Sequence, residues 1–140
     1  MENAWLVIGY TGRGSPTGRM VAKVARLLSE KPERLEEMEA IANITSAGLT
    51  ALSAGNLEAL GIAMDACHER LQKLEVSNPA LDRLVEAARP HSLGAKLTGA
   101  GGGGCMIALT EDPKRVAGAI EVAGGKPLSS RFGSDGVRLL

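Results

Sequence analysis

Hydrophobic and polar residues follow two different periods along the chain, and the change of period separates the predicted elements. A short apolar run at residues 5–10 leads into a glycine-rich loop, which indicates a strand. Four segments follow in which apolar residues recur every three or four positions, the spacing of helices with one buried face. After residue 90, short apolar runs return on both sides of a glycine-rich stretch, and these again indicate strands.

Capping residues, prolines and glycines set the predicted limits of these elements. In the fourth helix, Ser77 or Asn78 is the N-cap and Pro79 occupies the first turn. The predicted helices are a first around 21–28 that stops before 32, a second over 35–54, a third over 57–74, a fourth from 79 to 90 and a fifth from 112 to 123. The predicted strands are 5–10, 94–98, 105–110, 126–132 and 136–140.

This order of elements favours a single α+β domain over residues 1–140. The predicted order is a strand, four helices, two strands around a loop, a helix and closing strands. This order is typical of a mainly antiparallel sheet with helices covering one face. The length agrees, because 140 residues with 44% hydrophobic composition can form one domain with its own core.

Charge and composition exclude several classes of function. The 16 basic and 16 acidic residues cancel, and Trp, Tyr and Phe occur once each, so the chain offers neither a basic face for phosphate backbones nor aromatic platforms for bases. No apolar run is long enough to span a membrane, and the N-terminus does not resemble a secretory signal. We therefore expect a cytoplasmic protein that binds neither nucleic acid nor membrane, with Cys67 and Cys105 as reduced thiols.

The stretch at residues 99–104 is the strongest candidate for a binding site. All but one of its residues are glycine, and each glycine costs a folded chain about 0.5–1 kcal/mol relative to alanine. A flexible linker does not fit between two short strands that need each other as partners. The stretch also matches G-x-G-x-x-G, but a strand rather than a helix follows it, and without G-K-[ST] it is no Walker A loop.

A glycine-lined turn between strands has main-chain amides that no side chain shields. Clustered N–H groups of this kind form an anion-binding nest for phosphate or carboxylate oxygens. Hydrogen bonds to a charged acceptor contribute about 1.5–3 kcal/mol each, so two of them offset the cost of the glycines. We therefore expect phosphate to bind at Gly99, Ala100, Gly101, Gly102, Gly103 and Gly104.

The segment around this loop, AKLTGAGGGGCMIAL, resembles the third, C-terminal motif of the GHMP small-molecule kinases, and it is most similar to the form of that motif in mevalonate kinases. Three further segments resemble the same family. VIGYTGRGSPTGRMVAKV is similar to its strand, Ser/Thr loop and helix, LGIAMDACHERLQKLEVSNPALDRLVEAAR to its helix pair, and SSRFGSDGVRLL to its closing strand. The resemblance covers nearly the whole chain.

The resemblance implies a ferredoxin-like α+β domain, with extra helices, from the C-terminal half of a GHMP kinase. The complete mevalonate kinases transfer the γ-phosphoryl group of ATP to the C5 hydroxyl of mevalonate in isoprenoid biosynthesis. By this analogy, the glycine loop lines the ATP phosphate and substrate cleft, Thr98 and Ala100 lie near the acceptor alcohol, and Thr17 faces the same cleft. Backbone amides suit this work and can share it with Mg²⁺, because phosphoryl transfer depends on positioning and on stabilising oxyanion charge.

The sequence departs from the family in one respect. The family's main phosphate loop, Pro-x-Gly-x-Gly-Leu-x-Ser-Ser-Ala, and its catalytic aspartate and lysine belong to an N-terminal half, and this sequence contains none of them. We therefore expect no catalytic residue and no metal ligand here. ATP and Mg²⁺ would be bound mainly by an N-terminal kinase domain, in the same full-length chain or in a separate subunit, and the chain alone would be inactive. The sequence leaves open a homodimer, and also a stand-alone, non-catalytic module that senses a nucleotide or an isoprenoid phosphate.

Several other polar residues admit either a binding role or a plainer one. Alternation along residues 94–98 puts Lys96 on the same strand face as Thr98, where it would meet a phosphate near the substrate or form a surface ion pair. His68 is expected to be a partly exposed helix residue and His91 a loop residue, with no zinc pattern between them. Structural roles are expected for the aspartates Asp65, Asp82, Asp112 and Asp135.

Overall fold

The structure is a computed structural model that describes residues 3–133, 137 and 139, and its elements follow one another in the predicted order. The strands are β1 (Trp5–Tyr10), β2 (Gly94–Thr98), β3 (Cys105–Thr110) and β4 (Lys126–Arg131). The helices are α1 (Thr17–Glu30), α2 (Leu35–Ser53), α3 (Leu57–Lys73), α4 (Pro79–Ala88) and α5 (Pro113–Val122), with short 3-10 helices at Pro32–Arg34 and Arg89–His91. The strand predicted at 136–140 lies outside the described residues, apart from 137 and 139.

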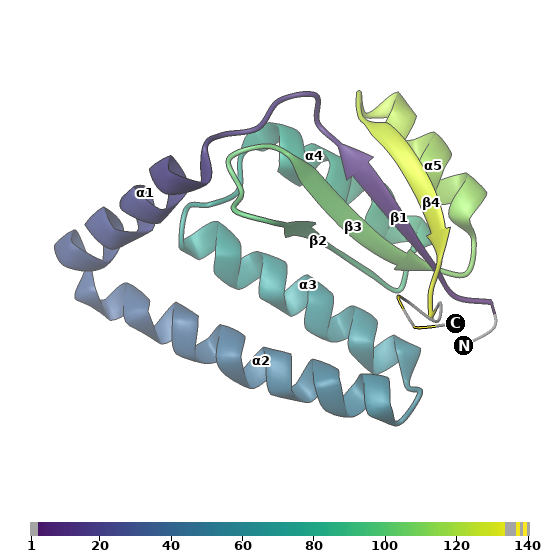
Figure 1. The fold of residues 1–140 in the computed structure, drawn as a ribbon, viewed down its shortest axis with the longest axis horizontal. Coiled ribbons are helices and arrows are strands. Elements are labelled where there is room, and N and C mark those ends of the chain that lie inside the picture. The colour runs from purple at the N-terminus through teal and green to yellow at the C-terminus, as the bar shows by residue number, and fades with distance from the viewer. Residues whose placement is uncertain (1–2, 134–136, 138, 140) are drawn as a thin grey trace.

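The four strands form one antiparallel sheet in the order β2-β3-β1-β4 (Figure 1). In its register Lys96 pairs with Ile107, Ile107 with Ile8, and Ile8 with Leu128. Since directly paired residues point to the same side, these four side chains form a row on one face. The predicted α+β class with a mainly antiparallel sheet is confirmed, and the strand order is that of a ferredoxin-like fold.

Helices α4 and α5 pack on one face of the sheet and enclose the main core (Figure 1). The three-and-four spacing of apolar residues in α4 predicts its buried side, which consists of Leu81, Leu84, Val85 and Ala88. These residues meet Val116 and Ile120 of α5 above the strand residues Val7, Met106 and Ala108. Of the two predicted caps of α4, Asn78 is the N-cap, because its side chain accepts a hydrogen bond from Leu81 N at 2.8 Å.

Helix α3 runs along β2, which is one of the two edge strands of the sheet. The two backbones approach closely because Gly61 and Gly94 have no side chains, and a Cβ on either would overlap with backbone atoms of the other segment. Two α3 side chains then bind amides of the edge strand: Ala95 N donates to Asp65 Oδ1 at 2.9 Å, and Leu97 N donates to His68 Nδ1 at 3.0 Å. Helix α3 thus takes the place of a further strand at this edge.

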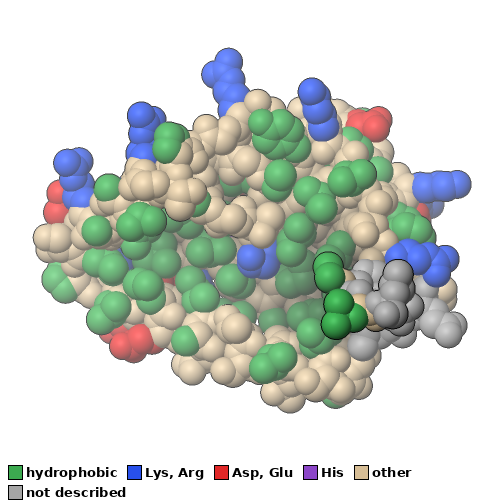
Figure 2. All heavy atoms as spheres, in the orientation of Figure 1, with side chains coloured by type: hydrophobic (Ala, Val, Ile, Leu, Met, Phe, Trp, Pro, Cys, Tyr) green, Lys and Arg blue, Asp and Glu red, His purple; other side chains and the backbone are tan. Residues whose placement is uncertain are grey.

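Helix α2 packs along α3 and forms the outermost layer on that side (Figure 1). Figure 2 shows hydrophobic side chains gathered over the face that α2, α3 and the sheet present together, with most Lys and Arg side chains at its rim. Among the described residues, no helix combines the length and the hydrophobicity that crossing a bilayer requires.

Candidate functional site

The glycine loop, residues 99–104, turns from β2 to β3 beside the segment that joins β1 to α1. Thr11 N donates to Gly104 O at 2.9 Å, and Gly104 N donates to Arg13 O at 2.6 Å. On its other side the loop packs closely against Val76. At Gly101, φ is 86°, and a Cβ would overlap with the Val76 carbonyl oxygen, so only glycine fits there. Two segments far away in the sequence therefore hold the loop in place.

A cavity of about 340 Å³ opens beside this loop. Among the residues predicted to form the site, those that line the cavity are Thr17, Thr98, Gly99, Ala100, Gly101, Gly103 and Gly104. Gly14, Ser15 and Cys105 complete the lining. The Ser/Thr-containing loop before α1 and the glycine loop, which lie more than half the chain apart in sequence, therefore face one space.

Two of the loop amides are already bound within the protein. Gly102 N donates to Val76 O at 2.8 Å, and Gly104 N donates to Arg13 O. Gly102 does not line the cavity, because it packs against Ser15, whose hydroxyl donates to Gly102 O at 3.0 Å. Within residues 3–133, the remaining loop amides donate to no protein acceptor; these belong to Gly99, Ala100, Gly101 and Gly103. Four of the six loop amides are therefore without a protein acceptor in this part of the chain.

Lys96 lies away from this cavity, although it shares a strand face with Thr98 as predicted. Ala95 and Leu97 are buried, whereas Lys96 and Thr98 are half-buried, which confirms the alternation along β2. The Lys96 ammonium donates to Leu97 O at 2.6 Å, and the side chain lines a separate groove between α2 and α3. Of the four residues predicted to lie near the substrate, Lys96 is the one that is not among the described residues lining the glycine-loop cavity.

His68 is fully buried, and the expectation of a partly exposed residue is wrong. Its Nδ1 accepts from Leu97 N, and its Nε2 donates to Asp82 Oδ1 at 2.9 Å. Asp82 also accepts from Ser77 at 2.6 Å and from Gln72 at 2.9 Å. The sequence contained the signal, because positions 64, 68 and 71 follow the four-and-three spacing of the buried side of α3.

This buried network supports the glycine loop from two directions. Leu97, which His68 binds, lies two residues before the loop. Ser77, which donates to Asp82, follows Val76, whose carbonyl binds Gly102. One imidazole and one carboxylate thus fix both the start of the loop and the segment on which it rests.

Burial lowers the pKa of the His68 imidazole below its ordinary value of 6.5 and outweighs the hydrogen bond and the charge of Asp82, which raise it. Because Nδ1 accepts a hydrogen bond, the neutral ring carries its proton on Nε2. Burial raises the pKa of Asp82, but the hydrogen bonds from Ser77, Gln72 and His68 together hold that pKa below its ordinary value of 3.8. At neutral pH the pair is therefore a neutral imidazole that donates to a carboxylate.

We expect the free energy of unfolding to fall as the pH decreases below about 6.5. In that range the unfolded chain protonates His68, whereas the native protein, with its lowered pKa, does not, so the unfolded state binds more protons. The stabilisation is complete above this range and is lost toward the lower, native pKa, with a slope of at most about 1.4 kcal/mol per pH unit. Urea unfolding at a series of pH values measures the slope. The His68→Gln variant should lack this component; an unchanged slope in the variant would contradict the assignment.

The other predicted polar residues have structural partners or lie apart from the site. Asp65 accepts from Arg89 Nε at 3.1 Å as well as from Ala95, and Asp112 accepts from Arg115 N at 3.3 Å as the N-cap of α5. These contacts and those of Asp82 give the three aspartates partners within the protein, whereas Asp135 lies outside the described residues. Cys67 and Cys105 are free and half-buried, and they line different cavities.

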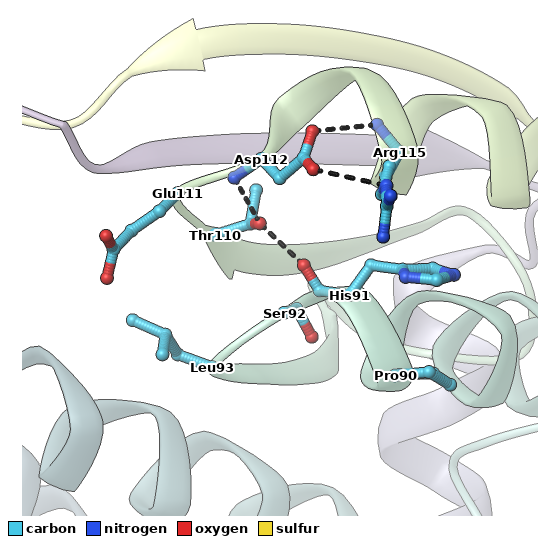
Figure 3. A pocket seen from close by; sticks show the side chains of 8 residues that line it. All are labelled: Pro90, His91, Ser92, Leu93, Thr110, Glu111, Asp112 and Arg115. Carbon is cyan, nitrogen blue, oxygen red and sulfur yellow. Dashed lines mark hydrogen bonds and ion pairs between the residues drawn. The ribbon is translucent and has the colours of Figure 1, made fainter.

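A further cavity, of about 240 Å³, lies at the opposite end of β3 from the glycine loop (Figure 3). Its central polar groups bind one another. Thr110 Oγ1 donates to His91 O at 2.7 Å and accepts from Asp112 N at 2.9 Å, and Asp112 pairs with Arg115 at 3.5 Å (Figure 3). We assign this cluster a structural role, because it joins the start of α5 to the turn before β2. In the described part of the chain, no three metal-ligating side chains gather at one place.

Residues 49–126, which include α3, α4, the glycine loop and α5, match the family model described as GHMP kinases C terminal. The chain belongs to the GHMP kinase family. The match confirms the resemblance that the glycine motif and its neighbours indicate, and it extends over more than half of the chain.

Individual GHMP kinases match nearly the whole chain. Mevalonate kinase from Pyrococcus furiosus is 39% identical over 142 residues, which cover 96% of this chain and 42% of the relative. The crystal structure of L. major mevalonate kinase with R-mevalonate is 30% identical, with a TM-score of 0.76, and the match covers 86% of this chain and 37% of that one. Streptococcus pneumoniae phosphomevalonate kinase, solved with phosphomevalonate and AMPPNP, shares the fold at 24% identity and a TM-score of 0.78, over 92% of this chain and 40% of that one.

The chain therefore corresponds to the C-terminal portion of mevalonate kinase-like GHMP kinases and spans less than half of their length. The predicted ferredoxin-like fold of such C-terminal domains is confirmed by these structures.

Proposed function

We propose that this chain is the C-terminal half of a mevalonate kinase, and that its glycine loop forms one wall of the cleft for the ATP phosphates and the acceptor alcohol. The observation that carries this proposal is a set of four loop residues, Gly99, Ala100, Gly101 and Gly103, that line one cavity and whose amides donate to no acceptor within residues 3–133. We propose mevalonate as the substrate because relatives of this chain are mevalonate kinases.

The chemistry of the loop suits phosphoryl transfer. The contacts with Val76 and Arg13 orient the loop before any nucleotide binds, so its free amides can stabilise charge on phosphoryl oxygens with little reorganisation. In this proposal the hydroxyls of Thr98 and Thr17, which line the same cavity, orient the acceptor alcohol. The contribution of this chain to the reaction is then positioning and charge stabilisation.

Among the described residues, none that lines this cavity has a carboxylate, an imidazole or an ammonium group. Its residues therefore do not fit Mg²⁺, and they offer no base for the proton of the alcohol. We propose that residues 1–140 are one C-terminal domain, and that an N-terminal kinase domain, in the same full-length chain or in a separate subunit, supplies the metal ligands, the base and most of the ATP site.

The chain alone is expected to release no ADP from ATP in the presence of mevalonate. A chimera with the N-terminal portion of the P. furiosus mevalonate kinase is expected to do so. In this chimera Thr98→Val should lower kcat/KM by about tenfold or more, because the hydroxyl that meets the acceptor is lost. Thr50→Val, at an exposed position of α2, is the matched control and should leave kcat/KM unchanged.

Mevalonate-dependent ADP release by the chain alone would contradict this division of roles. A folded chimera that binds AMPPNP but does not phosphorylate mevalonate would contradict the reaction. Micromolar binding of ATP or of a prenyl diphosphate by the lone chain, together with an inactive chimera, would favour the non-catalytic sensing module.

A further inference from the structure

Helices α2 and α3 enclose, together with β2, an apolar groove of about 370 Å³. This volume lies within the roughly 300–1,000 Å³ that is typical of pockets for small molecules. Aliphatic side chains from the two helices form its walls: Ile44, Leu49, Leu52, Leu60, Ala63 and Met64. None of the described residues that line the groove also lines the glycine-loop cavity, so the two are separate cavities.

Lys96 is the one charged side chain among the described residues that line this groove. Its ammonium donates to Leu97 O at 2.6 Å, and it forms no ion pair within residues 3–133. An ammonium has three N–H donors, so two of them remain for a ligand. Thr45, which also lines the groove, directs its hydroxyl to Ile41 O at 2.8 Å. Polar recognition in the groove therefore depends on Lys96.

We propose that this groove binds a small amphipathic anion, whose apolar body lies between α2 and α3 and whose carboxylate or phosphate meets Lys96. An uncharged apolar occupant would bury the ammonium without a partner for its free donors, which is unfavourable. An anion supplies that partner, and a charge-assisted hydrogen bond is about twice as strong as a neutral one. Such a ligand would join helices α2 and α3 to the strand that leads into the glycine loop.

Two native cysteines report on the two cavities separately. Cys67 lines the groove and Cys105 lines the glycine-loop cavity, and both thiols are free and half-buried. In the Cys105→Ser variant, the rate of maleimide labelling therefore measures the accessibility of Cys67 in the groove. In the Cys67→Ser variant, the labelling rate measures the accessibility of Cys105 beside the glycine loop.

Octanoate, octyl phosphate and octanol, each below its micelle concentration, are the probes. We expect at least one of the two anions to slow the labelling of Cys67 and to leave the labelling of Cys105 unchanged. Lys96→Met should weaken the binding of that anion by about tenfold or more, whereas Lys96→Arg should retain it. Octanol should bind the protein and Lys96→Met equally. Lys114→Met removes an exposed lysine of α5 outside the groove and should change nothing.

Protection by only one of the two anions supports the proposal and identifies the headgroup. Failure of both anions to protect Cys67 overturns the proposal, and so does equal anion binding by the protein and Lys96→Met. The proposal is also overturned if the protection of Cys67 increases with protein concentration and does not depend on the probes. The groove is then covered by a second copy of the chain. Protection of Cys105 by AMPPNP in the chimera tests the proposed kinase function instead, so the two proposals can fail independently.

Discussion

Gly101→Ala is expected to lower the free energy of unfolding by about 3 kcal/mol or more. The residue has φ of 86°, and an added Cβ would overlap with the Val76 carbonyl oxygen, a backbone atom that cannot rotate away. The loop would have to separate from Val76, and the hydrogen bond from Gly102 N to Val76 O, at 2.8 Å, would break. Urea unfolding of the two proteins measures the difference.

Gly99→Ala is the matched control for this variant. Gly99 also has a positive φ, 79°, but apart from its chain neighbours no atom of the described residues lies within 4 Å of the position that a Cβ would occupy. Its substitution should cost about 1–2 kcal/mol, from backbone strain alone. The difference between the two variants isolates the contact with Val76. Equal losses would show that this contact does not hold the loop.

His68→Ala is expected to destabilise the protein by about 3–5 kcal/mol. The side chain is completely buried, and its removal leaves a cavity between α3, α4 and β2. It also leaves Leu97 N without its acceptor and removes one donor from Asp82. Because both groups support the glycine loop, the same variant should label Cys105 faster than the parent protein does.

His91→Ala is the control, because that side chain is exposed and only the backbone carbonyl of His91 binds Thr110. Its effect should stay within about 0.5 kcal/mol. A loss below about 1 kcal/mol for His68→Ala would show that the buried network adds little to stability.

Periodicity and punctuation in the sequence predicted the type and order of the main helices and strands in the described residues, and the mainly antiparallel sheet, but not the order of its strands. The apolar runs on both sides of the glycine stretch became neighbouring strands, and the three-and-four spacing in α4 matched its buried side. The grouping of Thr17 and Thr98 with the glycine loop came from the family resemblance, and the structure places these residues around one cavity.

The sequence could not predict which loop amides are free. Gly102 and Gly104 bind Val76 and Arg13, and these acceptors lie in segments whose distance from the loop is set by tertiary packing. The cavity that Lys96 lines could not be predicted from the sequence either. Strand alternation predicts its face correctly, but only the placement of α2 against α3 decides that this face borders an apolar groove.

His68 shows a different kind of failure, because the spacing of apolar residues in α3 fits two neighbouring positions. Between Met64 and Leu71, both Cys67 and His68 suit the buried side. The stripe through Cys67 leaves His68 one step outside, beside Glu69 and Arg70, whereas the structure buries His68. Buried polar residues need partners that sequence does not reveal, here an edge amide of β2 and the carboxylate of Asp82.

Because Asp65 and His68 occupy outward amides of β2, that edge gives an incoming strand from another molecule few places to bond. The opposite edge, β4, contains Pro127, which has no amide hydrogen, and begins and ends with the cationic residues Lys126 and Arg131. Both edge strands of the sheet thus disfavour pairing with a strand from another molecule. Copies of this fold at high concentration should meet through their faces and not polymerise strand by strand.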